Sequence, residues 1–233
     1  MWNIAHRGAS GYAPENTRAA FDTALGMNAD WIETDVQMTA NGHLVLFHDA
    51  FVDRNSDGCG PVADYTLAEL RERDLGGWYG AAFAGERVLT VNEMVDEYVS
   101  RIPVVFEIKD PRATAPLLAL LIAREVIERV QVTSFLWYPL LEARALHPTV
   151  PLGYLTQRCD ADLLERLARR RIDQLCLHIG QLTAERVALA HAHGLALRAW
   201  GIDQRWQIDR LFETGVDGAT VNWPDWIAAH PAR

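Results

Sequence analysis

The sequence predicts an α/β fold, a TIM (β/α)8 barrel with a small insertion after the second strand. The first observation is a repeated βα rhythm, in which short apolar runs alternate with amphipathic segments. The second is that eight such strands fit into 233 residues, an ordinary length for this barrel, whereas a doubly wound open sheet normally has about five to seven strands. The third is a hydrophobic content of 49%, which suffices for one large core. We therefore expect residues 1–233 to form a single domain.

The eight expected barrel strands are the short apolar runs at 2–6, 29–38, 102–109, 129–135, 150–155, 172–178, 195–200 and 216–221. A further run at 43–49 is predicted to return antiparallel to the second strand as a hairpin. Helices are predicted for the amphipathic segments between the strands, at 14–26, 114–126, 138–146, 160–170, 183–194, 205–215 and 224–230. Strands joined by crossover helices are expected to lie parallel.

Residues 50–90 interrupt this rhythm. The stretches DRNSDGCG (53–60) and DLGGWYGAAFAGERV (74–88) are rich in turn-forming residues and have no regular period. We interpret this region as a small inserted subdomain in the loop after the second strand. In a TIM barrel such a loop lies at the C-terminal face, beside the active site.

Composition excludes several classes of partner. The formal charge is −9, and no run of Lys or Arg offers a surface for phosphate groups, so we expect no nucleic-acid partner. No apolar stretch approaches the roughly 18 residues of a membrane span, so we expect no stable membrane insertion. The three cysteines, Cys59, Cys159 and Cys176, lack the spacing of a disulfide framework or a zinc site. With no leader-like segment before the first strand, we expect a cytoplasmic protein.

Two predicted strand ends carry charged residues at alternate positions. Glu33 and Asp35 share one face of WIETDVQM, and Glu107 and Lys109 share one face of VVFEIKD. Burial of these charges in the barrel would cost several kcal/mol each, so they are expected at the open C-terminal mouth. A cluster of carboxylates is typical of a Mg²⁺ or Ca²⁺ site, and a network of ion pairs is the alternative.

The hairpin suggests where His48 lies. If Asn41 and Gly42 form a two-residue type I′ turn, Asp35 pairs opposite His48, which places this histidine beside the proposed metal. If Ala40, Asn41 and Gly42 form a three-residue loop with a bulge, Thr34 pairs with His48 instead.

The first strand ends at His6, and the following helix is predicted to begin near Pro14. His6 and His48, at separate strand ends, suit acid–base catalysis because an imidazole is readily neutral or charged near pH 7. Arg7 is a candidate phosphate-binding cation, and covering the barrel rim is its alternative role. Gly8 and Gly11 allow tight backbone turns near a ligand.

Five other histidines resemble turn or surface residues and receive no role: His43, His147, His191, His193 and His230. Near the C-terminus, Arg198 and Trp200 share one face of a strand. Either both side chains reach the mouth and flank a substrate, or Trp200 caps the core. No Ser-His-Asp order, GxSxG motif or activated cysteine is present, which disfavours covalent acyl chemistry.

Four motifs in order, HRGASGYAPENT (6–17), ETDVQMTANGHLVLFHD (33–49), LGGWYGAAFAGERVLTVNEM (75–94) and FEIK (106–109), resemble those of the glycerophosphodiester phosphodiesterase family. The resemblance extends through TSF, PLGYL and GVDGATVNWPD and so covers nearly the whole chain. It implies a TIM barrel with an inserted subdomain and hydrolysis of a small-molecule glycerophosphodiester to sn-glycerol 3-phosphate and an alcohol.

The resemblance also implies roles for individual residues. It suggests His6 as the base and His48 as the acid, and it places one divalent cation, Mg²⁺ or Ca²⁺, on Glu33, Asp35 and Glu107. It implies binding of substrate phosphate by Arg7 and Lys109. Trp200, from its position on the strand, is a further substrate-binding candidate.

Two departures from the family pattern are visible. Members often have Thr-Asp-x-Pro after the last strand, where this chain has VNWP (221–224), and Pro-Thr-Leu where it has LTV (89–91). Asn222 removes a negative charge at the mouth, which is expected to affect the pocket of the leaving alcohol and not the metal ligands.

Two alternative functions are compatible with these residues. One is a related phosphodiesterase, phospholipase D-like, acting on lysophospholipid or sphingomyelin, for which Trp78, Tyr79 and Phe83 would supply an apolar rim. The other is a non-catalytic barrel that binds a phosphodiester or a protein partner. Presence of both histidines and all three carboxylates favours an enzyme over the second alternative.

Overall fold

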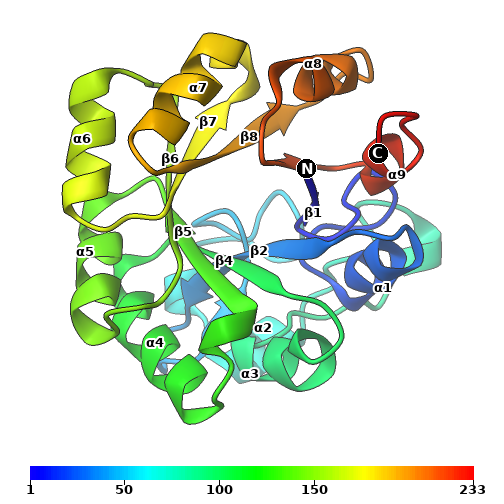
Figure 1. Cartoon of the computed structure of the whole chain (residues 1–233). Helices are drawn as coiled ribbons and strands as arrows, with labels where there is room; N and C mark the ends of the chain where they lie inside the picture. Colours follow the sequence, from blue (N-terminus) through cyan, green and yellow to red (C-terminus); the bar gives the residue numbers. More distant parts are fainter.

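The computed structural model describes residues 1–233 and shows a closed barrel of parallel strands surrounded by helices (Figure 1). The strand order is β1-β9-β8-β7-β6-β5-β4-β2, and the pairing of β1 with β2 closes the ring. A ninth strand, β3, pairs antiparallel with β2. The predicted TIM barrel is therefore confirmed.

Each barrel strand overlaps one of the eight predicted apolar runs. The strands are β1 (Trp2–His6), β2 (Trp31–Met38), β4 (Val104–Ile108), β5 (Val130–Ser134), β6 (Leu152–Thr156), β7 (Gln174–His178), β8 (Ala196–Ile202) and β9 (Gly218–Val221). Every residue of β4 is buried, as expected for a parallel strand that is covered on both faces. Function-bearing side chains can therefore reach water only where the strands end.

Helices cover the outside of the ring (Figure 1). They are α1 (Arg18–Gly26), α3 (Val91–Met94, continued by a π-helical turn at Val95–Val99), α4 (Thr114–Ala123), α5 (Trp137–Leu146), α6 (Ala161–Arg169), α7 (Ala184–Ala192), α8 (Gln207–Thr214) and α9 (Pro224–Ala228). Leu163, Leu164 and Leu167 of α6 are buried at helical spacing, so this helix packs one apolar face on the core. Short 3₁₀ turns lie at Val62–Asp64, Ala81–Phe83, Pro111–Ala113, Ile127–Arg129 and Ile179–Gln181.

The first helix starts later than predicted. It begins at Arg18 and not near Pro14, because Asn16 adopts a left-handed backbone conformation with φ of 59° that cannot continue into a helix. Thr17 is the N-cap, and its side-chain oxygen accepts a hydrogen bond from the Ala20 amide. Residues 7–17 therefore form a loop over the barrel mouth.

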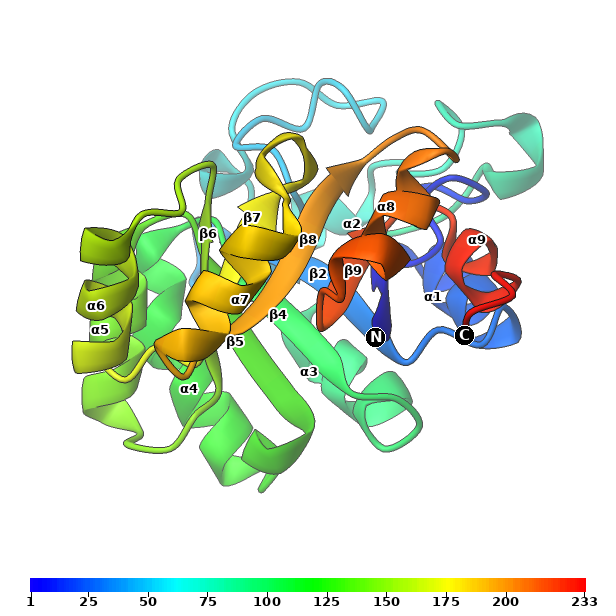
Figure 2. The same cartoon turned by 45° about the horizontal axis from the view of Figure 1, so that its top comes forward.

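The irregular region after β2 has a small apolar cluster of its own. It contains β3 (Leu44–Leu46) and the short helix α2 (Leu67–Arg71). The cluster is formed by Val45, Phe47, Val52, Val62, Leu70, Leu75 and Val88. Figure 2 shows this cyan and teal region at the end of the barrel toward which β8 points. The assignment of one domain with an inserted subdomain at about 50–90 stays a prediction.

No helix of the structure has both the length and the apolar character required to cross a membrane.

Candidate active site

A cavity of about 430 Å³ opens at the C-terminal ends of the barrel strands. Most of the candidate residues line it. The lining residues are His6, Arg7, Glu33, His48, Glu107, Lys109, Phe135, Leu155, His178, Arg198, Trp200, Gly201, Ile202, Asp203, Thr220 and Asn222. Strands β1, β2 and β4 supply mostly charged side chains, whereas β5 to β8 supply most of the apolar ones.

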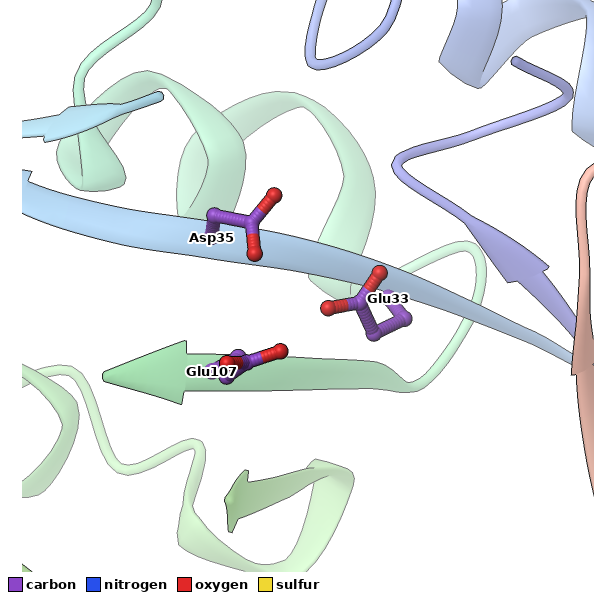
Figure 3. Close-up of side chains that lie close together, drawn as sticks. All are labelled: Glu33, Asp35 and Glu107. Atoms are coloured by element: carbon purple, nitrogen blue, oxygen red, sulfur yellow. The ribbon is translucent and has the colours of Figure 1, made fainter. Parts of the chain in front are cut away.

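Glu33, Asp35 and Glu107 lie together at this mouth, as the strand spacing predicts (Figure 3). Asp35 of β2 is the register partner of Glu107 on β4. One carboxylate oxygen from each residue lies within 4.8 Å of the others. All three residues are buried, with exposed fractions of 3%, 0% and 6%. Such a concentration of buried negative charge requires cations nearby.

Lys109 and Arg7 provide part of that positive charge. The Lys109 ammonium lies 2.5 Å from a Glu107 oxygen and 3.3 Å from Asp35 Oδ1, and Arg7 Nε lies 3.1 Å from Asp35 Oδ2. These two cations hold the pKa of Asp35 well below its usual range despite its burial. Burial, together with the charge of Asp35, raises the pKa of Glu33 and of Glu107. Neither of these two carboxylates is fully compensated.

The cluster fits a hard divalent cation. It offers only carboxylate oxygens, which Mg²⁺ and Ca²⁺ prefer. Asp35 Oδ1 and Glu107 Oε1 are both buried, and a single ammonium, that of Lys109, is the ion-pair partner of both. A divalent ion at these oxygens would remove the repulsion that raises the pKa of Glu33 and Glu107.

His6 is held by Asn222 of the loop after β9. Its Nδ1 lies 2.6 Å from Asn222 Oδ1, which can only accept a hydrogen bond, so Nδ1 carries the proton and Nε2 has a free lone pair. Nε2 lies 4.0 Å from a Glu33 oxygen. Burial and the positive charge of Arg7 lower the pKa of His6, which favours the neutral ring. The residue that departs from the family pattern thus contacts His6 directly.

The hairpin that carries His48 has the second of the two registers considered. Val36 pairs with Leu46 and Met38 with Leu44, and the amide of Thr39 donates to the His43 carbonyl. The loop is therefore Ala40-Asn41-Gly42, with Gly42 at a φ of 80°, so of the two alternatives the three-residue loop forms and Thr34, not Asp35, is in register with His48. The three-residue loop with a bulge forms because Thr39 Oγ1 accepts a hydrogen bond from the His43 amide, which stabilises the wider loop.

His48 lines the cavity although the register does not pair it with Asp35. Its Nδ1 lies 2.5 Å from Asp49 Oδ1, and Asp49 accepts a hydrogen bond from Arg54 Nε at 2.6 Å. Burial lowers the pKa of His48, and this is opposed by the charge of Asp35. A carboxylate at Nδ1 stabilises the protonated imidazole, so His48 differs from His6, which has a neutral amide partner.

A chain of ion pairs runs around this side of the mouth. Arg54 of the insertion also binds Glu15, with Nη2 2.9 Å from Oε1, and Glu15 in turn binds Arg7 at 2.9 Å. Through Asp49 and Glu15, a residue of the insertion therefore contacts the partners of both His48 and Arg7. The insertion thus holds charged residues of the mouth in place, although none of residues 50–90 lines the cavity.

The loop after β1 brings its backbone close to the carboxylates. Arg7 and Gly8 both have positive φ, 53° and 81°, and a Cβ on Gly8 would lie 2.6 Å from the Ala20 backbone. This turn directs the Arg7 amide toward Glu33 Oε2, to which it donates at 3.0 Å. Only glycine fits at position 8, and its close approach holds the loop against α1.

On β8, Arg198 and Trp200 both line the cavity, which settles their orientation in favour of the mouth. The Trp200 indole donates to the Cys176 carbonyl at 3.1 Å, and its ring meets Phe135 edge-on at 5.1 Å. Arg198 is 1% exposed, and the partner of its Nη2 is Cys176 Sγ at 3.2 Å. Two further guanidinium nitrogens of Arg198 have no hydrogen-bond partner.

Sequence reasoning missed several residues of this site. Asn16 donates to Asp35 Oδ2 at 3.0 Å and accepts from Thr34, so it fixes the orientation of the central carboxylate. Its place in the motif PENT, as a residue type that tolerates left-handed backbone, was the available signal. His178 and Phe135 also line the cavity. Their positions at the ends of β7 and β5 were the signal for them.

The proposed apolar rim lies apart from the cavity. Trp78 meets Tyr79 edge-on at 5.5 Å, and Tyr79 meets Phe83 in the same way at 5.5 Å. None of the three lines the cavity.

Comparison with known proteins agrees with this architecture. A glycerophosphodiester phosphodiesterase of Caldanaerobacter subterraneus subsp. tengcongensis is 35% identical, over 96% of this chain and 95% of the relative. One from Bacillus subtilis is 32% identical, over 95% and 83%. The crystal structure of an Agrobacterium tumefaciens glycerophosphodiester phosphodiesterase superimposes with a TM-score of 0.89 at 27% identity and covers 99% of this chain and 100% of that one.

A further solved structure carries a ligand. It is an Oleispira antarctica phosphodiesterase in complex with the product sn-glycerol-3-phosphate, with a TM-score of 0.88 at 28% identity and coverage of 98% and 96%. A model of the glycerophosphoryl diester phosphodiesterase family matches residues 6–226. The barrel, its mouth and these similarities together show that the chain belongs to the glycerophosphoryl diester phosphodiesterase family.

Proposed function

We propose that this protein hydrolyses glycerophosphodiesters, such as glycerophosphocholine or glycerophosphoethanolamine, to sn-glycerol 3-phosphate and an alcohol, and that it requires Mg²⁺ or Ca²⁺. The observation that carries the proposal is the placement of three buried carboxylates, two cations and two histidines around one cavity. The bound product of the Oleispira antarctica relative supports the substrate class.

Glu33, Asp35 and Glu107 are the residues that would hold the divalent cation. When bound, such an ion offsets negative charge on phosphate oxygens and lowers the pKa of a bound hydroxyl or water. Arg7 and Lys109 line the same cavity and bind the remaining phosphate charge. Arginine suits this role because its planar fork matches two phosphate oxygens, and lysine acts as a compact charge.

His6 is the base of the proposed reaction. Its Nδ1–H donates to Asn222, so Nε2 faces the reaction with a lone pair and receives the proton of the nucleophile. His48 is the acid. Asp49 at its Nδ1 stabilises the protonated ring, and the other nitrogen donates a proton to the leaving oxygen. Trp200 forms part of the wall against which the substrate lies.

The glycerol 2-hydroxyl is the proposed nucleophile, in preference to water. A divalent ion held by Glu33, Asp35 and Glu107 would lower the pKa of this hydroxyl, and the hydroxyl is already positioned near phosphorus because it belongs to the substrate. Hydrolysis of the resulting cyclic phosphate then gives sn-glycerol 3-phosphate.

A release assay on glycerophosphocholine with and without EDTA tests the function. We expect choline and sn-glycerol 3-phosphate to form, release to stop with EDTA, and excess Mg²⁺ or Ca²⁺ to restore it. Activity on lysophosphatidylcholine but not on glycerophosphocholine would support the lipid-directed alternative. Binding of glycerophosphocholine without turnover at any metal concentration would support the non-catalytic alternative.

A further inference from the structure

His178 lines the cavity at the end of β7, on the side opposite the metal-ligand candidates, and the mechanism above does not use it. Its strand neighbour is Trp200, and their rings meet edge-on at 4.7 Å. The surrounding wall includes Phe135, Leu155 and Ile202. A polar ring on such a wall needs a hydrogen-bond partner when a substrate displaces water.

The protein fixes the protonation site of this imidazole. The Gly180 amide donates to His178 Nδ1 at 3.1 Å, as part of the cap of the 3₁₀ turn Ile179–Gln181. Because Nδ1 accepts, the proton of the neutral ring resides on Nε2. The structure gives Nε2 no hydrogen-bond partner within the protein. His178 therefore presents one oriented N–H donor.

Backbone geometry also holds the ring in place. Gly201, the residue after Trp200, has a φ of 78°, and a Cβ there would lie 2.7 Å from both Cδ2 and Nε2 of His178. The absence of a side chain at 201 is thus what allows the imidazole to occupy this position. Trp200, which meets the imidazole edge-on, is itself fixed by its hydrogen bond to the Cys176 carbonyl.

We propose that His178 Nε2–H donates a hydrogen bond to the sn-1 hydroxyl of the glycerol moiety and so selects glycerol over other alcohols on that side of the phosphate. This assignment rests on the proposed function, in which His48 at the β2–β3 side protonates the leaving alcohol.

The strand order determines which half of the substrate lies near His178. Around the ring, β7 is four positions from β2 in one direction and four in the other, so His178 lies across the mouth from the hairpin that carries His48. In-line displacement puts the leaving alcohol and the nucleophile on opposite sides of phosphorus. The glycerol therefore lies on the far side of phosphorus from the alcohol that His48 protonates. Its 2-hydroxyl faces His6 on β1, and its sn-1 end extends across the cavity toward β7 and β8. Its remaining hydroxyl, at sn-1, needs a donor there.

The test is a cycle of two enzymes and two substrates. The enzymes are wild type and His178→Phe, and the substrates are glycerophosphocholine and its analogue without the sn-1 hydroxyl, propane-1,2-diol phosphocholine. We expect the wild-type kcat/KM to fall about tenfold on removal of the hydroxyl, because one buried donor loses its acceptor. The His178→Phe enzyme should treat the two substrates nearly alike. His178→Gln, which retains an N–H donor, should recover part of the discrimination.

His43→Phe is the matched control, since His43 is exposed next to the hairpin loop and the β2–β3 hairpin lies across the ring from β7. It should retain the wild-type ratio. An equal loss in wild type and His178→Phe would overturn the assignment while leaving the proposed function intact. Failure of wild type to cleave glycerophosphocholine at all would overturn the proposed function and this assignment with it.

Discussion

Substitution of Glu107 by Gln separates metal binding from folding. The three carboxylate oxygens lie within 4.8 Å of one another, so each pair repels by about 3.5 kcal/mol at an effective dielectric constant of about 20. Glu107 takes part in two such pairs. Its attraction to the Lys109 ammonium at 2.5 Å is about 6.6 kcal/mol on the same scale. Because the repulsion that is relieved and the attraction that is lost nearly cancel, the metal-free variant should unfold at nearly the wild-type temperature.

Metal-dependent stabilisation should change much more. Mutation of a residue that hydrogen-bonds to a metal ligand weakens metal binding about 10- to 100-fold. Loss of one of three carboxylate ligands is therefore expected to weaken metal binding by at least the upper value, about 100-fold. At a metal concentration 100 times the wild-type Kd, the stabilisation falls from about 2.7 to about 0.4 kcal/mol. For a chain of this length, the metal-induced rise in Tm should fall from about 5–11 °C to about 1–2 °C.

Thermal unfolding with and without Mg²⁺ or Ca²⁺ measures both quantities in one experiment, and calorimetric titration gives the Kd directly. Glu128→Gln, at an exposed position without an ion pair, is the matched control for loss of one negative charge. It should keep the full metal-induced shift. The reasoning would be refuted by an unchanged shift in Glu107→Gln, or by a metal-free Tm that falls by more than about 10 °C.

Three further predictions concern catalysis and pH. His6→Ala and His48→Ala should each lower kcat at least about 100-fold with nearly unchanged Tm, and near-wild-type kcat in either would make that histidine structural. A substrate that lacks the glycerol 2-hydroxyl should bind but turn over far more slowly, whereas an unchanged kcat would identify metal-bound water as the nucleophile and make His6 the base for that water. Because the pKa of Glu33 and of Glu107 is raised, protons compete with the metal at these groups. Affinity measured by titration should therefore rise from pH 5 to pH 8, and a flat profile would contradict the assignment.

The periodic features of the chain were predictable from the sequence. Alternation of apolar runs with amphipathic segments gave all eight barrel strands, because burial on both faces leaves a strand little freedom in composition. Because side chains two residues apart in a strand point to the same face, Glu33 and Asp35 were expected on one face. In the closed barrel, the strand that carries Glu107 pairs with theirs, so Glu107 lies next to them. These inferences need only local geometry and the rule that function lies at the C-terminal strand ends.

Non-periodic features were less predictable. The hairpin register depended on whether Asn41-Gly42 formed a two-residue turn or Ala40-Asn41-Gly42 formed a three-residue loop. The hydrogen bond that Thr39 Oγ1 accepts from the His43 amide stabilises the three-residue loop. The start of α1 depended on Asn16, which leaves the helical region so that it can bind Asp35. The local preferences were for a two-residue Asn-Gly turn and for a helix that starts at Pro14. In both cases a side-chain hydrogen bond outweighs the local preference.

His178 shows a different limit. Its position at the end of a predicted strand indicates a place at the mouth. The orientation of its ring depends on Gly180 and Gly201, whose effects appear only in three dimensions. Arg198 is a similar case. The presence of this charged residue in a buried strand is explained only by the cavity that its side chain lines. The role of a single polar residue on an otherwise apolar strand can be assigned only once its position in the closed barrel is known.

The contacts of Asp35 link metal binding to phosphate binding. Its two oxygens are approached by Lys109, Arg7 and Asn16, at 3.3, 3.1 and 3.0 Å. A divalent ion held by Asp35 and Glu107 would compete with Lys109 for these carboxylates, because like charges at such distances repel. Lys109 should then shift from the carboxylates toward the cavity, where the substrate phosphate is its natural partner. Metal binding would thereby release the lysine that the phosphate requires, so substrate should bind more tightly to the metal-loaded protein than to the metal-free one.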